Sequence, residues 1–395
     1  MHCQARRAIL VAAVVGVAAA VAQQAMPVGG QLATADRVQG SGWWPTKPST
    51  QRRDYIGTAT CAQCHARHAE TQRATAMART ATRAANSEVL RPDRTLTFSH
   101  GGYRYEIAAN GNERIYSVAG AGARSSVALT WAFGEGKVGQ SFLFERDGTF
   151  HEVRVSYYDS VHALDFTPSR AIDAPRTLDE AMSRPIGQAE IRRCFACHTT
   201  APIADGVFDA SSATPGVTCE ACHGPGRRHV DAIKLRRMDE ARTAILNPAR
   251  LDPIDSVDFC GACHATFWDV KLADERGIAA LRSQPYRLQS SRCWNGGDAR
   301  LTCIACHNPH VALVRDAAAY DARCLNCHLA RGAEPKREPA LSERPVTRPR
   351  VEGRSVRACR VADARCTSCH MPKYDVPGMH HEFTDHLIRI NRGRP

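Results

Sequence analysis

The sequence Cys-x-x-Cys-His occurs seven times in this chain of 395 residues. Composition alone predicts roughly 0.03 such matches, because Cys and His each supply about 4% of the residues. The motifs begin at Cys61, Cys194, Cys219, Cys260, Cys303, Cys324 and Cys366. Their second cysteines are Cys64, Cys197, Cys222, Cys263, Cys306, Cys327 and Cys369, and their histidines are His65, His198, His223, His264, His307, His328 and His370. Any fold must hold the two cysteines and the histidine of each motif in one local arrangement.

The chemistry that fits this triplet is covalent haem attachment. Two cysteines three residues apart can form thioethers to the two vinyl groups of one haem, and the adjacent histidine reaches the iron as its proximal ligand. Zinc ribbons need no histidine directly after the second cysteine, and a thioredoxin-like motif would occur once, near a βαβ pattern. We therefore expect seven covalently attached haem c groups, with the fourteen motif cysteines as attachment points and the seven motif histidines as iron ligands.

The N-terminus has the pattern of an export signal. Arg6 and Arg7 precede an apolar stretch over 8–22, and Ala20-Val21-Ala22 offers a small-residue cleavage site. The stretch is about 15 residues long, short of the roughly 20 that a spanning helix needs. We expect a signal peptide over 1–22 and a periplasmic or extracytoplasmic mature protein. The alternative is that the N-terminal stretch stays uncleaved and anchors the protein. We would expect membrane contact only through such an anchor.

The positive charge of the chain is largely offset by the expected haems. The formal net charge is +12. Removal of Arg6 and Arg7 leaves about +10, while seven haems add about 14 propionate charges and about seven positive ferric cores. The oxidised holoprotein would then be near about +3 and the reduced one near about −4, so we expect no nucleic-acid partner.

The motifs are unevenly spread, and this suggests an order of segments. After 1–22 we expect an N-terminal segment over 23–53, a first haem-binding segment over 54–95 and a β-rich segment over 96–160. A multihaem domain with haems 2 to 6 follows over 161–330, then a loop or linker over 331–357 that is rich in Pro and Arg, and a C-terminal segment with haem 7 over 358–395.

Alternating apolar residues predict antiparallel strands between the first two motifs, with turns at Asn110-Gly111 and Asp147-Gly148. The expected strands lie in 103–107, 113–118, 126–133, 141–144 and 151–157. Between the later motifs we expect short helices at best, for example over 231–246 and 270–282. The predicted fold class is a multihaem cytochrome c: mainly short α-helices and irregular loops around stacked haems, with a small antiparallel β-rich segment between haems 1 and 2.

Nine further histidines are available as sixth iron ligands, besides His2 of the signal. They are His68, His100, His151, His162, His229, His310, His380, His381 and His386. His310 follows the proximal His307 by three residues, too near to reach the opposite face of the same haem, so it would ligate a neighbouring one. Cys293 and Cys359 also remain, either as a disulfide or as two unrelated thiols.

Three stretches resemble the multihaem cytochromes related to the four-haem cytochrome c-554. They are Gly216 to Val230 around the third motif, Leu301 to His310 around the fifth, and Cys366 to Lys373 followed by His380 and His386. The resemblance implies that His229, His310, His380 and His386 are distal ligands, and that neighbouring haems stack in near-parallel or perpendicular pairs. The pattern is weaker near the first haem, where Met77, His68 or His100 are the candidates for the sixth ligand.

Seven haems on one chain make a row of redox centres, so we expect an electron carrier with no catalytic residues. Its partners would be redox proteins, either other cytochromes or a membrane quinol-linked donor. The alternative is a multihaem oxidoreductase that converts a small nitrogen or sulfur oxyanion at one open-coordination haem. Since all seven motifs end in histidine, the carrier is favoured. A third possibility is that the β-rich segment docks a redox partner.

Overall fold

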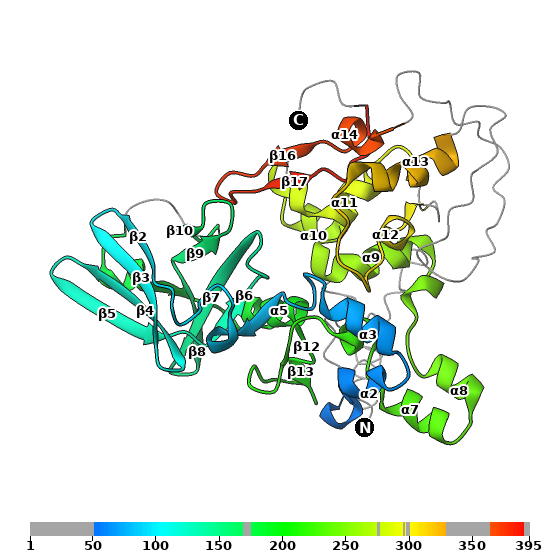
Figure 1. Cartoon of the computed structure of the whole chain (residues 1–395), viewed down its shortest axis with the longest axis horizontal. Coiled ribbons are helices and arrows are strands. Elements are labelled where there is room, and N and C mark those ends of the chain that lie inside the picture. Colours follow the sequence, from blue (N-terminus) through cyan, green and yellow to red (C-terminus); the bar gives the residue numbers. More distant parts are fainter. Residues whose placement is uncertain are drawn as a thin grey trace, which may run out of the picture. The chain divides into compact units, whose positions relative to one another are not determined.

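Antiparallel strands occupy the region between the first and second motifs in a computed structural model of the protein (Figure 1). The structure describes residues 51–168, 175–274, 277–294, 297, 301–328 and 364–390. The predicted signal peptide, most of the segment 23–53 and the loop over 331–357 lie outside the described residues. So does Cys359, and with it the choice between a disulfide to Cys293 and two unrelated thiols.

The strands form two sheets. The smaller one has the order β2-β3-β4-β5, with β2 (Leu96–His100), β3 (Tyr103–Asn110), β4 (Glu113–Gly120) and β5 (Ala123–Ala128). The larger one has the order β1-β6-β7-β8-β11, while β9 pairs with β7 and β10 pairs with β9. Its strands are β1 (Ala81–Arg83), β6 (Trp131–Phe133), β7 (Gly139–Arg146), β8 (Thr149–Val153), β9 (Val155–Tyr158), β10 (Ala163–Phe166) and β11 (Ser183–Pro185).

The strands predicted at 103–107, 113–118 and 141–144 are present, whereas those predicted over 126–133 and 151–157 are each divided, into β5 and β6 and into β8 and β9. Turn residues explain where several strands end. Asp147 and Gly148 join β7 to β8 with φ of 51° and 72°, the left-handed conformation that a two-residue type I′ hairpin turn requires at both positions. Gly111, at φ 58°, turns β3 into β4. The region is larger than expected, because paired strands begin at Ala81 and end at Pro185 rather than staying within 96–160.

Alternation along the strands builds a hydrophobic core for this region. Tyr103, Tyr105 and Ile107 of β3 point to the same side and are buried. They belong to a cluster of nineteen buried residues, which includes fully buried Tyr116 and Phe142. A second cluster of eight buried residues surrounds Trp131 and reaches into the helix that carries the second motif.

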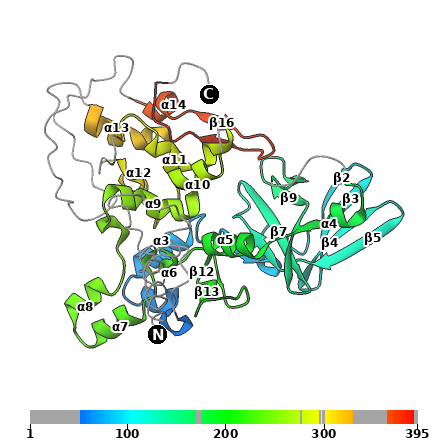
Figure 2. The ribbon, with the colours of Figure 1, turned by 180° about the vertical axis from the view of Figure 1, so that it is seen from behind.

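The remaining described residues form short helices and three two-stranded ribbons (Figures 1 and 2). The α-helices are α2 (Thr58–Ala62), α3 (Ala66–Arg73), α4 (Leu178–Met182), α5 (Gln188–His198), α6 (Cys219–His223), α7 (Arg227–Lys234), α8 (Met238–Thr243), α9 (Pro253–His264), α10 (Phe267–Leu272), α11 (Gln284–Gln289), α12 (Cys303–Cys306), α13 (Asp321–His328) and α14 (Cys366–His370). The 3₁₀ helices are η1 (Arg52–Asp54), η2 (Ala84–Asn86), η3 (Pro248–Arg250), η4 (Ala279–Arg282) and η6 (Ala317–Tyr320). The ribbons pair β12 (Thr199–Thr200) with β15 (Thr214–Pro215), β13 (Ile203–Ala204) with β14 (Val207–Phe208), and β16 (Lys373–Asp375) with β17 (Glu382–Thr384).

Two expected helices are interrupted. The predicted helix over 231–246 is a helical hairpin, because α7 ends at Lys234 and Arg236 adopts a left-handed φ of 56° before α8 begins. The predicted helix over 270–282 is also divided, since α10 ends at Leu272 and η4 begins only at Ala279, after Gly277 at φ 58°. Within the residues that the structure describes, no helix combines the length and apolar character needed to cross a bilayer.

Candidate haem-binding sites

Each Cys-x-x-Cys-His motif overlaps a short helix, although in the first motif only Cys61 and Ala62 belong to the helix and Cys64 and His65 follow its end. The helices are α2 for the first motif, then α5, α6, α9, α12, α13 and α14 in chain order. Residues three and four positions apart lie on the same face of a helix. This geometry brings the two thiols and the following histidine to one side of the chain, as attachment to a single macrocycle requires.

Local sequence explains where α9 begins. Asp252 precedes α9 and its carboxylate accepts hydrogen bonds from Ile254 N and Asp255 N, both at 2.9 Å, while Pro253 occupies the first helical position. The helix then runs twelve residues and ends at His264. The fourth motif is therefore fixed by an N-terminal cap placed well before its first cysteine.

Two buried carboxylates connect motifs that are distant in the sequence. Glu220, inside the third motif, is 3% exposed and accepts hydrogen bonds from Ile56 N, Gly57 N and Gly226 N at 2.8 to 2.9 Å. These amides lie just before the first motif and at the start of α7. Glu220 thus holds the first motif against the third.

Asp321 has the same role for the last two motifs. It begins α13, which carries the sixth motif, and its carboxylate accepts from Arg365 N at 2.6 Å and Cys366 N at 2.8 Å. These are the first amides of α14, which carries the seventh motif. Carboxylates that receive such backbone bonds satisfy amides that a helix start leaves without intrahelical partners.

Thiols of different motifs lie close enough to shift one another's pKa. The pairs are Cys61 with Cys219, Cys197 with Cys263, Cys260 with Cys303, and Cys324 with Cys366. Cys222 also lies near Cys260, and Cys306 near Cys324. Each motif therefore adjoins another, in the order first, third, fourth, fifth, sixth and seventh, with the second motif beside the fourth.

The environment of the motif cysteines is mostly apolar. Burial raises the pKa of Cys222 to about 12, and burial is also the main reason that the pKa of Cys194 is raised to about 12. Cys219 differs, because the hydrogen bond from the Cys61 thiol lowers its pKa to about 6. The side chain of Cys327 lies outside the described part of the chain.

Several motif histidines present a defined ring nitrogen. Backbone carbonyls accept hydrogen bonds from the Nδ1 atom of His223 (Leu246 O, 2.8 Å) and of His370 (Arg389 O, 2.9 Å). Nδ1 of His198 lies 2.7 Å from Thr80 Oγ1 and 3.2 Å from Thr80 O. A proton held on Nδ1 leaves the Nε2 lone pair for a metal, which is the tautomer that iron ligation needs.

Burial keeps four of these imidazoles neutral. Desolvation lowers the pKa of His198, His223, His264 and His307 below its usual value. A neutral imidazole is the form that binds a metal ion. Thiols paired on one helical face and a neutral histidine with a free Nε2 are the donor set for haem c, and the residues present therefore fit that group.

Two of the four predicted distal histidines, His310 and His386, lie beside motif histidines. The His310 and His223 rings are parallel within 5°, with centroids 5.9 Å apart, and the His386 and His307 centroids are 6.2 Å apart. Burial is the main cause that lowers the pKa of both His310 and His386 to about 4. His229 of α7 donates from Nδ1 to Ala241 O at 2.8 Å, as the motif histidines do.

His380 has a different environment from the other three. Its Nε2 lies 2.7 Å from Asp165 Oδ2, its ring centroid is 4.7 Å from that of Tyr158, and its carbonyl accepts from Ser160 Oγ at 2.7 Å. These contacts connect the β16–β17 ribbon to β9 and β10. Ligation by His380 would require its Nε2 to leave Asp165.

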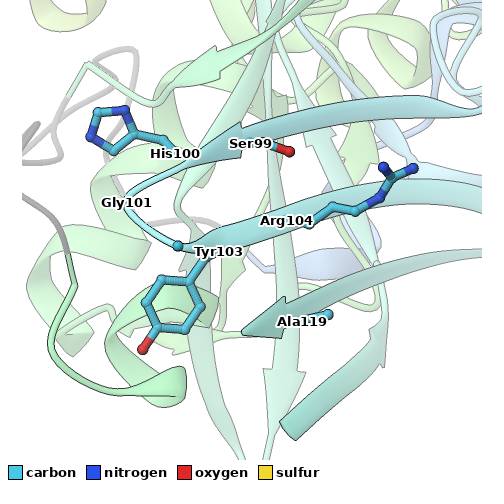
Figure 3. A pocket seen from close by; sticks show the side chains of 7 residues that line it. Ser99, His100, Gly101, Tyr103, Arg104 and Ala119 are labelled. Carbon is cyan, nitrogen blue, oxygen red and sulfur yellow. The ribbon is translucent and has the colours of Figure 1, made fainter. Parts of the chain in front are cut away.

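The structure places the three candidates for the sixth ligand of the first haem in different surroundings. The His68 ring lies 4.9 Å from that of His310 and also interacts with His223, whereas Met77 is half-buried and its carbonyl accepts from Val217 N. His100 lies at the end of β2, beside the turn at Gly101 and a shallow pocket of the small sheet (Figure 3). Its ring contacts are Phe98 and Phe166 of the β-rich region.

Sequence reasoning missed the residues that hold the motifs in place. The sequence gives no indication of three of these groups, because any residue can offer a carbonyl and threonine is common. They are the carbonyls of Leu246 and Arg389 and the Thr80 side chain. Glu220 and Asp321 offered a weak signal, since each is an acidic residue within or a few positions before a motif. Their remote amide partners are visible only in the folded chain.

Residues 150–224, which include the second and third motifs, match the family model described as cytochrome c554 and c-prime. Among solved structures, the chain is similar to the outer cell wall cytochrome OcwA, with a TM-score of 0.47 and 13% identity over 85% of this chain and 80% of that chain. No curated protein matches the sequence.

Proposed function

We propose that this chain is a multihaem c-type cytochrome that transfers electrons along seven covalently attached haem c groups, since it carries seven Cys-x-x-Cys-His motifs and residues 150–224 match the family model described as cytochrome c554 and c-prime. When bound, each haem supplies a one-electron iron centre that cycles between the ferric and ferrous states. The fourteen motif cysteines would hold the macrocycles and the seven motif histidines their irons.

The observation that supports this proposal is the unbroken adjacency of the motifs. Neighbouring cysteines connect each motif to another, from the first through the third, fourth, fifth and sixth to the seventh. A carrier needs such adjacency because electron tunnelling decays exponentially with the distance between centres. A protein that used one isolated haem would have no need of it.

We propose that most of these haems have two histidine ligands. His310 opposite His223 and His386 opposite His307 are the best supported pairs, because their ring separations of 5.9 and 6.2 Å leave room for one iron between two nitrogens. His229 is a third distal candidate, with an Nδ1 bond that leaves Nε2 free. His380 is a weaker candidate, because its Nε2 is bonded to Asp165.

The test is to count the haems and to determine their coordination. The chain is produced in a host competent for haem c maturation, and intact-mass spectrometry and haem quantitation are compared with electron paramagnetic resonance spectra. We expect seven haem mass increments and low-spin ferric signals. An unmodified polypeptide would overturn the proposal, whereas a high-spin signal in a chain with seven haems would support the alternative of an oxidoreductase with an open iron.

We also propose an extracytoplasmic location, because haem c is attached outside the cytoplasm and residues 1–22 have the pattern of an export signal. The redox partners would then be other cytochromes or a membrane quinol-linked donor. N-terminal sequencing of the mature protein tests this proposal. A sequence that begins after Ala22 is expected, and a retained Met1 would indicate an anchor or a cytoplasmic chain.

A further inference from the structure

The α7–α8 hairpin ends in an exposed tip, which we define as residues 233–239 (Figure 2). All seven side chains of the tip are exposed. Arg236, at φ 56°, reverses the chain between the two helices. On the inner side of the hairpin, Ala232 and Ala241 are buried at 3% and 1% exposure, so the two helices support each other and the tip projects beyond them.

The tip carries three large apolar side chains. Leu235 is 60% exposed, Met238 49% and Ile233 38%. An exposed apolar residue is ordinary when it is alone, but a group of them within one turn marks an interaction site. Leu235 also lines a groove at the base of the tip, together with three arginines, Arg227, Arg228 and Arg237, and three acidic residues, Asp54, Asp231 and Glu240.

Basic residues surround these apolar side chains. Over 227–242 the chain has six Lys or Arg residues and three Asp or Glu residues, a net charge of +3. Two of the three acids are engaged by arginines of the same hairpin, Glu240 with Arg228 at 3.3 Å and Asp239 with Arg242 at 3.4 Å. Lys234 and Arg236 extend the positive charge to the tip itself. The surface therefore presents an apolar centre within a basic rim.

This surface is close to a candidate haem ligand. His229 and Ile233 lie four residues apart on α7, about 6 Å along the helix axis. Nδ1 of His229 is bonded to Ala241 O of the opposing helix at 2.8 Å, so the hairpin also holds this histidine. A partner bound at the tip would lie next to an iron that His229 ligates.

From these observations we propose that the α7–α8 tip is the docking surface for an acidic, one-electron redox protein whose own apolar patch covers Leu235 and Met238. This inference rests on the proposed electron-transfer function and adds to it the place and chemistry of partner binding. One electron leaves the reduced centre of the partner and converts one ferric haem to ferrous, with no transfer of atoms. Opposite charges would steer the encounter and the apolar centre would retain it.

An anionic membrane surface is the other occupant that basic and apolar side chains could suit. The tip fits a protein better, because its three apolar side chains give little area to bury in a bilayer.

The experiment follows the reduction of the haems by flavodoxin hydroquinone, an acidic flavin protein. The anionic hydroquinone loses one electron to the haem and becomes the neutral semiquinone. Stopped-flow absorbance of the holoprotein gives the second-order rate constant at several salt concentrations. For Lys234→Glu with Arg236→Glu we expect a fall of about 10-fold or more at low salt and a weaker salt dependence. For Leu235→Ser with Met238→Ser we expect about a threefold fall with an unchanged salt dependence.

The control is Arg124→Glu with Arg146→Glu, which makes the same change of charge on exposed positions of β5 and β7. Less than about a twofold effect is expected there if the tip is the docking surface. If the tip and control variants slow the reaction equally, the effect is one of overall charge and the proposal is overturned.

Two further measurements separate this proposal from its premise and from membrane binding. Haem quantitation and full reduction by dithionite show whether the electron carrier itself is intact, so a failure there rejects the proposed function. Intact haems with an unchanged flavodoxin rate reject the docking surface alone. Sedimentation with vesicles of phosphatidylglycerol and phosphatidylcholine tests the alternative, because charge-sensitive vesicle binding with an unchanged flavodoxin rate would assign the tip to the membrane.

Discussion

The strand-rich region and the motif-bearing helices are built on different kinds of core. The strands between Ala81 and Pro185 enclose nineteen buried residues in one cluster, many of them aromatic or β-branched. Among the described residues beyond α5, the hydrophobic clusters contain two and three buried residues. The first region can bury enough apolar surface to fold by its own side chains, whereas the second needs large apolar groups from elsewhere, which haem would supply.

The largest effect is expected when haem attachment is prevented. In a host without haem c maturation, the full chain should keep slow amide exchange in β3, β4 and β7, because their core contains protein side chains alone. Exchange in α6, α9 and α12 should become faster by about 100-fold or more. Hydrogen exchange with mass spectrometry compares the haem-free chain with the holoprotein, and equal protection of both regions in the haem-free chain would refute the comparison.

A cavity in the strand-rich core should have the opposite regional effect. Phe142 of β7 is fully buried, so Phe142→Ala should lower the free energy of unfolding of this region by about 3–5 kcal/mol. Haem absorbance should stay unchanged, since Phe142 is distant from the motif helices in the sequence and packs in a different hydrophobic cluster. Glu145→Ala, on an exposed position of the same strand, should change the free energy by less than about 0.5 kcal/mol. Loss of haem signals in Phe142→Ala would mean that the two regions unfold as one.

Among the motif helices, a single carboxylate should have a smaller but specific effect. In Glu220→Gln the amide keeps one acceptor oxygen for three backbone N–H groups, and unpaired amides should cost about 1–3 kcal/mol. The lost negative charge should also raise the reduction potential of a nearby haem, because the ferric form carries more positive charge. Potentiometric titration and thermal unfolding measure both changes. Asp239→Asn, whose side chain is 99% exposed, should alter neither.

The smallest effect concerns pH in the strand-rich region. Burial, and then the charge of Arg146, lower the pKa of His151, whose Nδ1 lies 3.2 Å from Ser183 Oγ. The unfolded chain therefore takes up this proton more readily, and the region should lose stability as the pH falls below the ordinary histidine value of about 6.5. In His151→Gln the loss between about pH 7.5 and 5.5 should be smaller, as measured by amide exchange of β8. An identical pH dependence in both proteins would exclude His151 as the cause.

The sequence carried local information well, and this follows from the physics of each signal. The Asp147-Gly148 turn was predictable because left-handed backbone is costly for most residues. The strands were predictable because one face of each strand must be apolar, which makes apolar and polar residues alternate along the sequence. The left-handed break at Arg236 was not, because arginine gives no warning of it.

Long-range arrangement was beyond the sequence. Nothing in the spacing of the motifs indicates that the first lies against the third, or that the sixth is joined to the seventh by Asp321. These contacts depend on backbone amides, which every residue offers. The Nε2 of His380 illustrates the same limit, because a histidine near a motif can be engaged by a carboxylate 215 residues away.

The remote partner of Glu220 also affects how the protein must be assembled. Gly57 meets this carboxylate across 163 residues, and Ile56 across 164. A haem attached at the first motif before the third motif has folded against it would lack this support. The unfinished chain would then hold an apolar, redox-active group open to solvent. We expect a chaperone in the compartment of haem attachment to protect it from aggregation and from stray oxidation.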